Sequence, residues 1–475
     1  MSDLISIEEC ENFPIEKIWD LYRHYVSGSQ VDLIASFGFG RDVSNYAEGC
    51  YIYTKNGDKV LDFTGGIGVL NHGHNHPRIV EIRRKFQEQQ RMEVHKNFFS
   101  PYVAALSHNL AQLLPGDLDV SYFPNSGSEA VEGAVKMAYK YHGGKRQYIL
   151  HADISFHGKL MGAASLTGSP ELHFHFPGIS GARKFEFGNI DSVRDVVAEL
   201  RQSTGGSDVY AIILEPMSAS SLRECSAEFL LSLRELCTAE DIVLIFDEVY
   251  TGWAKTGSLF YFMRHDGLLP DIVTYAKSFG GGKSSISGYT ARTPIFKKAY
   301  DNLHDATLHS TTYYGFGEEC ATAIEAINVV VEENFVERAQ NIHEKLRDGL
   351  HSLQNKYPDL IEEVRGTGAL HGLILKPNRA GEILGNLTKT LPSNFFKDDQ
   401  LMNKIVTAAV IYELYQSHKV MTYYGSNREI PLIAAPSLIA EDSDVDWFLD
   451  ALDQSLSLGF VKLTGKFIKS KVLGP

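Results

Sequence analysis

Three short, largely apolar runs, each closed by a charged residue, place the strongest constraint on the fold of this chain. They are residues 211–214 before Glu215, residues 242–246 before Asp247, and residues 271–276 before Lys277. Such runs are typical of strands that are covered on both faces, as in a parallel sheet. Ligands in open α/β sheets bind at the carboxyl ends of the strands. The sequence therefore predicts an α/β fold with a ligand site beside these charged residues, although Glu215 alone could equally be a surface group at a strand end.

Lys277 carries the clearest chemical signal. A lysine at the carboxyl end of a buried strand loses the solvation of its ammonium form, and the free amine is the form that condenses with a carbonyl. This placement suggests a cofactor that bears an aldehyde. A lysine considered alone is more often a solvated surface residue, so the neighbouring residues must decide between the two interpretations.

A second segment has the composition of an anion site. Residues 125–130 (NSGSEA) lie between an expected strand, 120–123, and an expected helix whose apolar positions are 131, 134, 135 and 138. Small residues at the start of a helix leave backbone amides free to contact an anion, and the helix dipole adds to the attraction. We therefore expect a phosphate at this turn. The alternative is a simple serine N-cap with Glu129 in the first helical turn.

The residues around Lys277 form a longer pattern. In order along the chain they are residues 246–249 (FDEV), 251–252 (TG), 256–257 (TG), 270–272 (PDI) and 276–282 (AKSFGGG). This pattern resembles the cofactor signature of class III aminotransferases, the ornithine and omega-amino acid type of pyridoxal-phosphate enzyme with fold type I. The resemblance extends from about Gly49 to about Leu458 and implies pyridoxal 5'-phosphate as the cofactor.

The resemblance also implies an architecture. We expect a large α/β domain with a mixed, mostly parallel seven-stranded sheet and a smaller α+β domain from both chain ends. The expected divisions are residues 1–95 for the lead-in and part of the small domain, 96–335 for the cofactor-binding domain, and 336–475 for the rest of the small domain. The apolar periodicity predicts a helix across 324–353. Residues 378–400 are expected to form an inserted loop near the entrance.

By the same resemblance, individual residues acquire roles. Lys277 would hold the cofactor aldehyde as a Schiff base and then move a proton as base and acid, while Asp247 would favour the protonated pyridine ring. Phe156 and Val249 would pack on opposite faces of that ring, and Glu215 would belong to the network around cofactor and substrate. The other implied cofactor-binding residues are Ser126, Gly127, Ser128, His157, Tyr250 and Thr312.

Thr312 bears on the assembly, because the corresponding residue of the family caps the cofactor phosphate of a partner subunit. The resemblance therefore implies a homodimer with a composite active site. Residues 313–318 (YYGFGE) replace the usual glycine-glycine-asparagine-proline pattern, so the loop after Thr312 departs from the family.

Substrate recognition also departs from the family pattern. Many members bind a substrate carboxylate with an arginine that a glutamate can neutralise, and here Ile433 and Ser220 stand at those two positions. Arg428 is the candidate replacement, similar to the mobile arginine of amine transaminases; the alternative is a solvated loop arginine. Ile67 stands where ornithine-specific relatives carry a tyrosine. Together these residues favour an amine or terminal amino donor on a sizeable, partly apolar substrate, with a keto acid or aldehyde as acceptor.

Two functions remain open. The leading interpretation is an aminotransferase that works by a ping-pong mechanism; the alternative is an aminomutase or racemase of the same fold, which needs no separate carboxylate-binding switch. We expect no metal site, because His72, His74 and His76 alternate without cysteine or carboxylate partners at zinc-site spacing.

Charge and composition exclude other classes. The net charge is -14 with no basic block, which argues against binding to nucleic acid or to a membrane surface. No run is long enough to cross a bilayer and the N-terminus has no cleavable apolar segment, so we expect a cytoplasmic enzyme. The five scattered cysteines fit reduced thiols.

Overall fold

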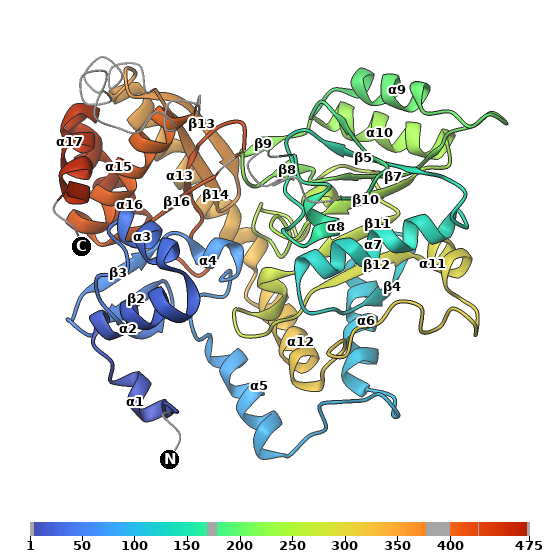
Figure 1. Cartoon of the computed structure of the whole chain (residues 1–475), viewed down its shortest axis with the longest axis horizontal. Helices are drawn as coiled ribbons and strands as arrows, with labels where there is room; N and C mark the ends of the chain where they lie inside the picture. Colours follow the sequence, from blue (N-terminus) through green and yellow to red (C-terminus); the bar gives the residue numbers. More distant parts are fainter. Residues whose placement is uncertain (1–3, 169–177, 377–399, 426, 473–475) are drawn as a thin grey trace.

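The computed structural model describes residues 4–168, 178–376, 400–425 and 427–472. Figure 1 shows two lobes, one built around a large central sheet and the other built from both ends of the chain. The central sheet has the strand order β4-β12-β11-β10-β7-β5-β6. β12 is antiparallel to both neighbours and the other pairs are parallel, which confirms the predicted seven-stranded, mostly parallel sheet. The strands are β4 Leu118–Tyr122, β5 Tyr148–Ala152, β6 Ala182–Phe185, β7 Val209–Leu214, β10 Val243–Asp247, β11 Ile272–Tyr275 and β12 Gly288–Arg292.

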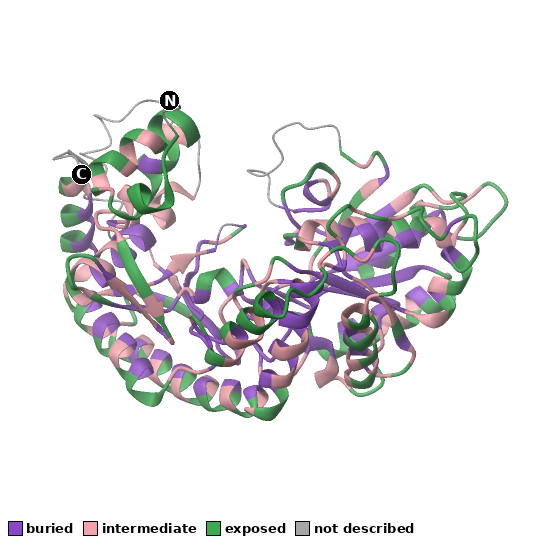
Figure 2. Cartoon of the chain, turned by 90° about the horizontal axis from the view of Figure 1, so that it is seen from below, coloured by how far each residue is buried: buried purple, intermediate pink, exposed green. Residues whose placement is uncertain are grey.

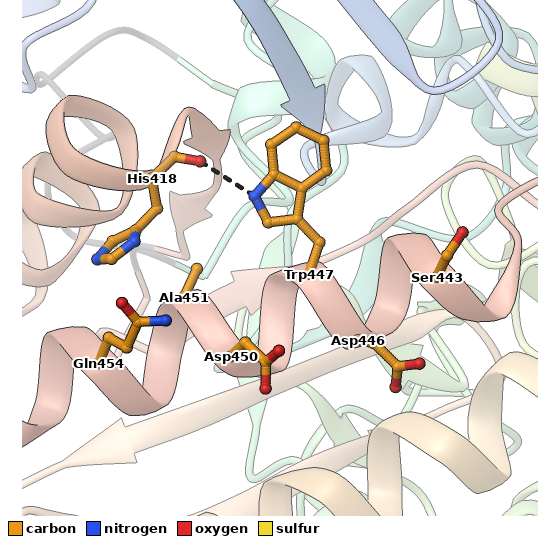
Figure 3. Close-up of a pocket in the computed structure, with 7 residues that line it drawn as sticks. All are labelled: His418, Ser443, Asp446, Trp447, Asp450, Ala451 and Gln454. Atoms are coloured by element: carbon orange, nitrogen blue, oxygen red, sulfur yellow. Dashed lines mark hydrogen bonds between the residues drawn. The ribbon is translucent and has the colours of Figure 1, made fainter.

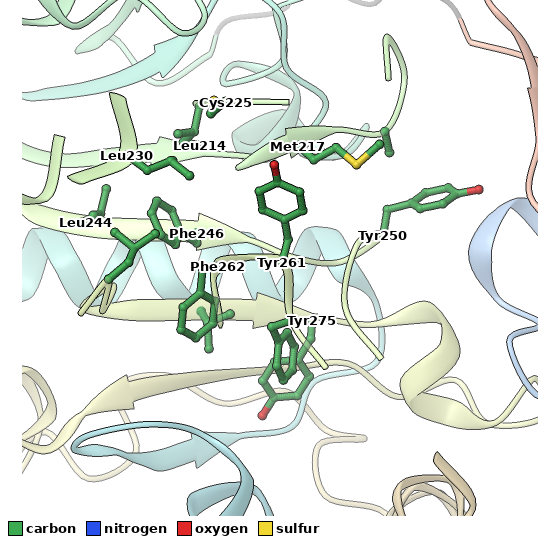
Figure 4. Packing of buried hydrophobic residues seen from close by; sticks show 14 of the residues in the cluster. Leu214, Met217, Cys225, Leu230, Leu244, Phe246, Tyr250, Tyr261, Phe262 and Tyr275 are labelled. Atoms are coloured by element: carbon green, nitrogen blue, oxygen red, sulfur yellow. The ribbon is translucent and has the colours of Figure 1, made fainter. Parts of the chain in front are cut away.

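Helices cover both faces of this sheet. Successive strand residues point to opposite sides, so apolar side chains of one strand pack against the helices on each side. On one side Phe246 packs in the cluster that contains Leu230, which Figure 4 shows from close by. On the other side Ile245 packs with Val131. In Figure 2 the strands of this sheet are buried, whereas the helices carry exposed residues. The helices of this lobe are α6 Pro101–Leu113, α7 Gly127–Tyr141, α8 Met161–Ala164, α9 Ile190–Glu199, α10 Ala227–Ala239, α11 Thr293–Ala299 and α12 Gly317–Glu332, and a short two-stranded sheet pairs β8 Met217–Ser218 with β9 Arg223–Glu224.

The second lobe joins the two chain ends in one core. β15 pairs in parallel with β3, and the ring of Phe63 stacks on that of Phe448 with centres 4.7 Å apart. Its strands are β1 Ser44–Glu48, β2 Tyr51–Thr54, β3 Lys59–Asp62, β13 Ile361–Thr367, β14 Leu370–Leu375, β15 Val420–Met421, β16 Tyr423–Tyr424 and β17 Leu432–Ala434. Its helices are α1 Ile7–Glu11, α2 Ile15–Tyr22, α3 Gly28–Ser36, α4 Gly65–Gly68, α13 Phe335–Lys356, α15 Leu401–His418, α16 Asp442–Ser457 and α17 Gly459–Val472, and α5 Pro77–Glu88 contacts α12 of the other lobe.

The helix predicted across residues 324–353 is interrupted. The structure has α12 and α13 in its place, with Asn334 between them at φ +54°. Asparagine tolerates this left-handed conformation better than most residues, and apolar periodicity alone does not register it. The predicted domain boundaries at 95 and 335 stay predictions, and the predicted loop at 378–400 lies almost wholly outside the described residues. None of the described helices combines the length and apolar character that crossing a bilayer requires.

Candidate active site

Three charged side chains lie at the carboxyl ends of adjacent strands of the central sheet. β7, β10 and β11 are adjacent and parallel, so the residues that follow them emerge on the same side of the molecule. Glu215, Asp247 and Lys277 stand at these three strand ends. This is the edge at which the sequence predicts a ligand.

The carboxylate of Asp247 is buried and held on both oxygens. Oδ1 accepts hydrogen bonds from the Val249 amide at 3.0 Å and from the Thr274 hydroxyl at 3.2 Å. Oδ2 accepts from Nδ1 of His157 at 2.7 Å, a contact that assigns the proton to that ring nitrogen. The other ring nitrogen of His157, Nε2, is buried without a hydrogen-bond partner among the described residues. The contacts to Oδ1 and Oδ2 fix the position and orientation of the Asp247 carboxylate.

Glu215 is the second buried acid of the site. Its Oε2 accepts from the Phe156 amide at 2.8 Å, and its Oε1 accepts from the Ala219 amide at 3.4 Å. Burial raises the pKa of Glu215 to about 7; His157 opposes this rise and the charge of Asp247 adds to it. A carboxyl group with such a pKa can hold or release a proton near neutral pH.

Lys277 combines a strained backbone with a perturbed amine. It opens the short 3₁₀ helix Lys277–Gly280 (η4) at φ +52°, a conformation that costs a residue with a side chain roughly 1–3 kcal/mol and is enriched at functional sites. Burial lowers the pKa of Lys277 to about 8, against the raising effect of Glu215 and Asp247. Its Nζ lies 3.8 Å from the centre of the Tyr250 ring.

The turn before α7 forms the capping box that the N-cap alternative anticipates. The Ser126 hydroxyl accepts from the Glu129 amide at 3.3 Å, and the Glu129 carboxylate accepts from the amides of Asn125 and Ser126, each at 2.9 Å. The amides of Gly127 and Ser128 are not part of this box. An N-cap and an anion site are thus compatible here, since they use different amides.

This turn lies directly against the other predicted residues. A Cβ on Gly127 would come within 3.0 Å of Val249 and 3.5 Å of Ala276, the residue before Lys277. A Cβ on Gly158 would come within 2.0 Å of the Ser128 hydroxyl. The start of α7, the strand ends and the segment around His157 therefore converge on one place.

Phe156 is an exposed ring within a buried segment. Its side chain is 37% exposed, whereas its neighbours Ser155 and His157 are buried. The Glu215 carboxylate fixes the backbone of Phe156, and Thr167 accepts from the His157 amide at 3.0 Å. An aromatic face is thus held at the edge of the site.

Thr312 is exposed, and its loop is fixed to the site within the same chain. The Asn125 side chain donates to the Tyr313 carbonyl at 3.1 Å, and the Thr311 amide donates to the Tyr122 hydroxyl at 3.0 Å. Thr312 therefore lies in a loop adjacent to the turn that precedes α7.

The two predicted substrate residues, Ile67 and Arg428, are exposed, whereas Ile433, at the position of the family's arginine, is buried. Ile67 is 56% exposed at φ +57°, and Arg428 is 59% exposed and forms an ion pair with Asp153. Ile433 is fully buried, and Ser220 contacts Asn427, whose Nδ2 lies 3.2 Å from the serine hydroxyl.

Several contacting residues escaped the sequence analysis. Tyr423 of β16 contacts the Tyr250 hydroxyl through its own hydroxyl, and Asp153 pairs with Arg428. Thr274 lies inside an apolar run, opposite Asp247 in the β10–β11 register, and this pairing is the only sequence-level signal for its role. The Tyr423–Tyr250 and Asp153–Arg428 contacts join segments that are far apart in the chain, so no local sequence pattern predicts them.

Other polar groups lie outside this site. His72, His74 and His76 contact three different partners, the Ala326 carbonyl at 3.0 Å, Asp62 at 2.9 Å and Glu333 at 3.3 Å. Figure 3 shows residues that line a surface hollow along α16, where Trp447 donates to the His418 carbonyl at 3.1 Å. The hollow has a volume of about 490 Å³. Its Asp446 is paired with Lys345 at 2.8 Å, so this hollow belongs to the packing of the second lobe.

Comparison with known proteins identifies the family. Residues 42–456 match the family described as "Aminotransferase class-III". The chain is a class III aminotransferase. This assignment confirms the resemblance at the cofactor signature, and with it the fold type I architecture, an enzyme of the transaminase class and pyridoxal phosphate as the cofactor.

Solved structures share the fold of this aminotransferase at low sequence identity. A transaminase from the marine bacterium Virgibacillus has a TM-score of 0.79 at 21% identity, with 95% of this chain and 99% of that chain covered. An (S)-enantioselective omega-transaminase from Thermomicrobium roseum has a TM-score of 0.78 at 22% identity, with coverage of 94% and 98%. An ornithine aminotransferase from Toxoplasma gondii, with partial occupancy of PLP at its active site, has a TM-score of 0.78 at 20% identity, with coverage of 98% and 100%.

The residues of this aminotransferase fit pyridoxal phosphate. The amides of Gly127 and Ser128 suit a phosphate, because the first amides of a helix attract anions. A side chain on Gly127 would narrow the space between that turn and the strand ends. Asp247, with its direction fixed, suits a protonated ring nitrogen, and the amine of Lys277 suits an aldehyde.

Proposed function

We propose that this aminotransferase moves an amino group from an amine or terminal-amino donor to a keto-acid or aldehyde acceptor by a ping-pong mechanism. The observation that carries the proposal is the amine of Lys277, with its pKa lowered to about 8, beside two buried acids at neighbouring strand ends. A racemase or aminomutase would use the same residues, so kinetics must distinguish the two.

The proposed chemistry divides between the cofactor and the protein. Pyridoxal phosphate, when bound, supplies an aldehyde that reacts with amines and a ring that withdraws electrons. Lys277 would bind that aldehyde through Nζ, and once a substrate amine has taken its place Nζ would accept and donate a proton as base and acid. Asp247 would keep the ring nitrogen protonated, and the hydrogen bonds from His157 and Thr274 orient the Asp247 carboxylate for that task.

Binding of the cofactor is proposed to use the remaining predicted residues. Gly127 and Ser128 receive the phosphate, with Ser126 capping the helix beneath it. Phe156 and Val249 would pack against the ring. Glu215, which is neutral below a pH of about 7, adjusts the charge around Lys277.

Arg428 is proposed to receive the carboxylate of a keto-acid acceptor. Its guanidinium reaches across to Asp153, which adjoins the segment that carries Phe156. Ile433 is buried among apolar residues and offers no charge. Ile67, exposed on α4, is proposed to contact the apolar part of a donor.

A homodimer is proposed as the active unit, with Thr312 contributing to the partner's phosphate site. Support comes from exposed apolar side chains on two adjacent segments, which include Phe98 at 69% and Leu303 at 96% exposure. Lys96 connects these segments, since its Nζ donates to the Thr311 carbonyl at 3.2 Å. Exposed apolar surface of this kind is typical of interfaces. Sedimentation at micromolar concentration should give twice the mass of the chain, and a monomer would contradict this part of the proposal.

The main experiment follows the cofactor by its colour. An amine donor alone should convert the enzyme to its pyridoxamine form with release of a carbonyl product, and an acceptor should reverse the change. If substrate is isomerised with no such conversion, the aminomutase or racemase alternative holds. Replacing Lys277 with alanine should abolish the visible band of the lysine-linked cofactor; retention of that band at the same wavelength would refute the role of Lys277.

A further inference from the structure

The ring of Tyr250 lies against the amine of Lys277. Nζ is 3.8 Å from the ring centre, which is within the range of a cation–π contact. The Tyr250 ring packs closely against Gly68, because a Cβ on Gly68 would come within 2.9 Å of the Cζ atom of Tyr250. Gly68 has φ +87°, so both its conformation and its lack of a side chain suit this approach. Tyr250 therefore has little freedom to move away from Lys277.

A second tyrosine holds the other end of this ring. The Tyr250 hydroxyl contacts the hydroxyl of Tyr423, which lies on β16 of the second lobe. In Figure 4 the Tyr250 side chain points away from the other labelled residues, toward the ribbons of that lobe. Burial raises the pKa of both phenols above the ordinary value, so each is neutral at physiological pH. Their contact is thus a neutral hydrogen bond between residues of the two lobes.

We propose that Tyr250 is a positioning residue for Lys277: its ring face holds the ammonium form of the lysine whenever the substrate nitrogen has displaced it. The close packing against Gly68 keeps the ring in place even without the hydroxyl contact. This inference rests on the proposed function, in which Lys277 is released and recaptured in each half of the reaction. The contact favours the charged form, because the face of the ring attracts a cation more strongly than a neutral amine. Tyr250 thereby opposes the effect of burial, which favours the neutral amine.

The consequence is a measurable pKa. In the enzyme reconstituted with pyridoxamine 5'-phosphate the Lys277 amine is free, and its pKa can be obtained from competitive acetylation at a series of pH values, with the Lys277 peptide quantified by mass spectrometry. Tyr250→Leu and Tyr250→Met remove the ring and should lower the pKa of Lys277 by about one pH unit, the size expected for a partly desolvated cation–π contact. Two ring-free variants are used so that misfolding of one leaves the test intact.

Three controls separate the ring from the hydroxyl and from general effects. Tyr250→Phe and Tyr423→Phe keep the ring of residue 250 but break the hydroxyl contact, and both should leave the pKa of Lys277 within about 0.3 of the wild-type value. Tyr25→Leu, at an exposed position of the lead-in, should do the same. The pH profile of a single turnover with a carbonyl acceptor should move in the same direction as the labelling in the ring-free variants.

The outcomes are distinct. An unchanged pKa of Lys277 in both ring-free variants overturns the proposal, and an equal fall in the two phenylalanine variants assigns the effect to the hydroxyl and overturns the role of the ring face. The labelling requires no turnover, so it remains informative if the enzyme fails as a transaminase. Failure of the proposed function would instead appear as substrate isomerisation without conversion to the pyridoxamine form, or as a visible cofactor band that survives Lys277→Ala.

Discussion

Replacing Glu215 with glutamine should remove a pH-dependent loss of stability. The pKa of Glu215 is raised by burial from 4.5 to about 7 in the folded protein. Below about pH 4.5 the carboxyl group is neutral in both the folded and the unfolded chain. Between pH 4.5 and 7 the unfolded chain releases its proton while the folded protein keeps it, so the free energy of unfolding falls as pH rises. Above pH 7 both forms are charged and the loss is complete.

The size of this loss follows from the width of the interval. At about 1.4 kcal/mol for each pH unit, the interval from 4.5 to about 7 corresponds to about 3 kcal/mol. With an unfolding entropy of about 2.1 cal/mol/K per residue, a chain of 475 residues that unfolds as one unit changes its Tm by about 1 °C per kcal/mol. The wild-type Tm should therefore fall about 3 °C further than that of Glu215→Gln between pH 5 and pH 8.

The assay is thermal unfolding of the two cofactor-free proteins across this range, since binding of the cofactor has a pH dependence of its own. Glu248, whose pKa burial also raises to about 7, is present in both proteins and cancels from the comparison. Glu337→Gln, at an exposed position of α13, controls for the loss of one carboxylate. Parallel Tm curves for wild type and Glu215→Gln would refute the reasoning that the buried acid keeps its proton.

Two further predictions concern catalysis. His157→Leu removes a hydrogen bond to the buried Asp247 carboxylate, typically worth about 1.5–3 kcal/mol, and should lower kcat/KM by about 10-fold or more. His157→Asn retains a donor and should lower kcat/KM less, so equal losses in the two variants would contradict the assigned contact. Arg428→Ala should raise the KM for a keto-acid acceptor by about 10-fold with little effect on an apolar amine donor, whereas Asp153→Asn, which frees the guanidinium, should lower the acceptor KM. If neither substitution changes the KM for the acceptor, Arg428 does not bind the substrate.

The strand ends could be predicted from the sequence because their signal is local. The apolar runs before Glu215, Asp247 and Lys277 became β7, β10 and β11, and the apolar positions after residue 130 became the buried face of α7. In a parallel sheet the carboxyl ends of strands share an edge, so the convergence of the charged residues followed without knowledge of the remaining fold. The order of the strands and the antiparallel β12 depend on long-range pairing and were not predicted; only the mixed, mostly parallel seven-stranded sheet came from the family resemblance.

The parts of the site that escaped prediction join distant segments. Tyr423 reaches Tyr250 across 173 residues, and Arg428 reaches Asp153 across 275. Each contact depends on how the second lobe sits against the central sheet, which neither periodicity nor spacing encodes. The capping box at Ser126 was visible in the sequence as an alternative to an anion site, and the structure makes the two compatible because separate amides serve them.

The burial of Ile433 bears on where a substrate carboxylate would bind. This residue pairs with Tyr423 in the β16–β17 register and lies in the apolar cluster that includes Tyr250. A guanidinium at that position would place a charge among apolar groups, which is costly without a partner. Under the proposed function, a substrate carboxylate would therefore bind at the exposed rim, where Arg428 is paired with Asp153. The Arg428 guanidinium is 59% exposed, so solvent screens its side of the pair. We therefore expect a substrate carboxylate to compete with Asp153 for this guanidinium, and an apolar amine to bind while the pair stays closed.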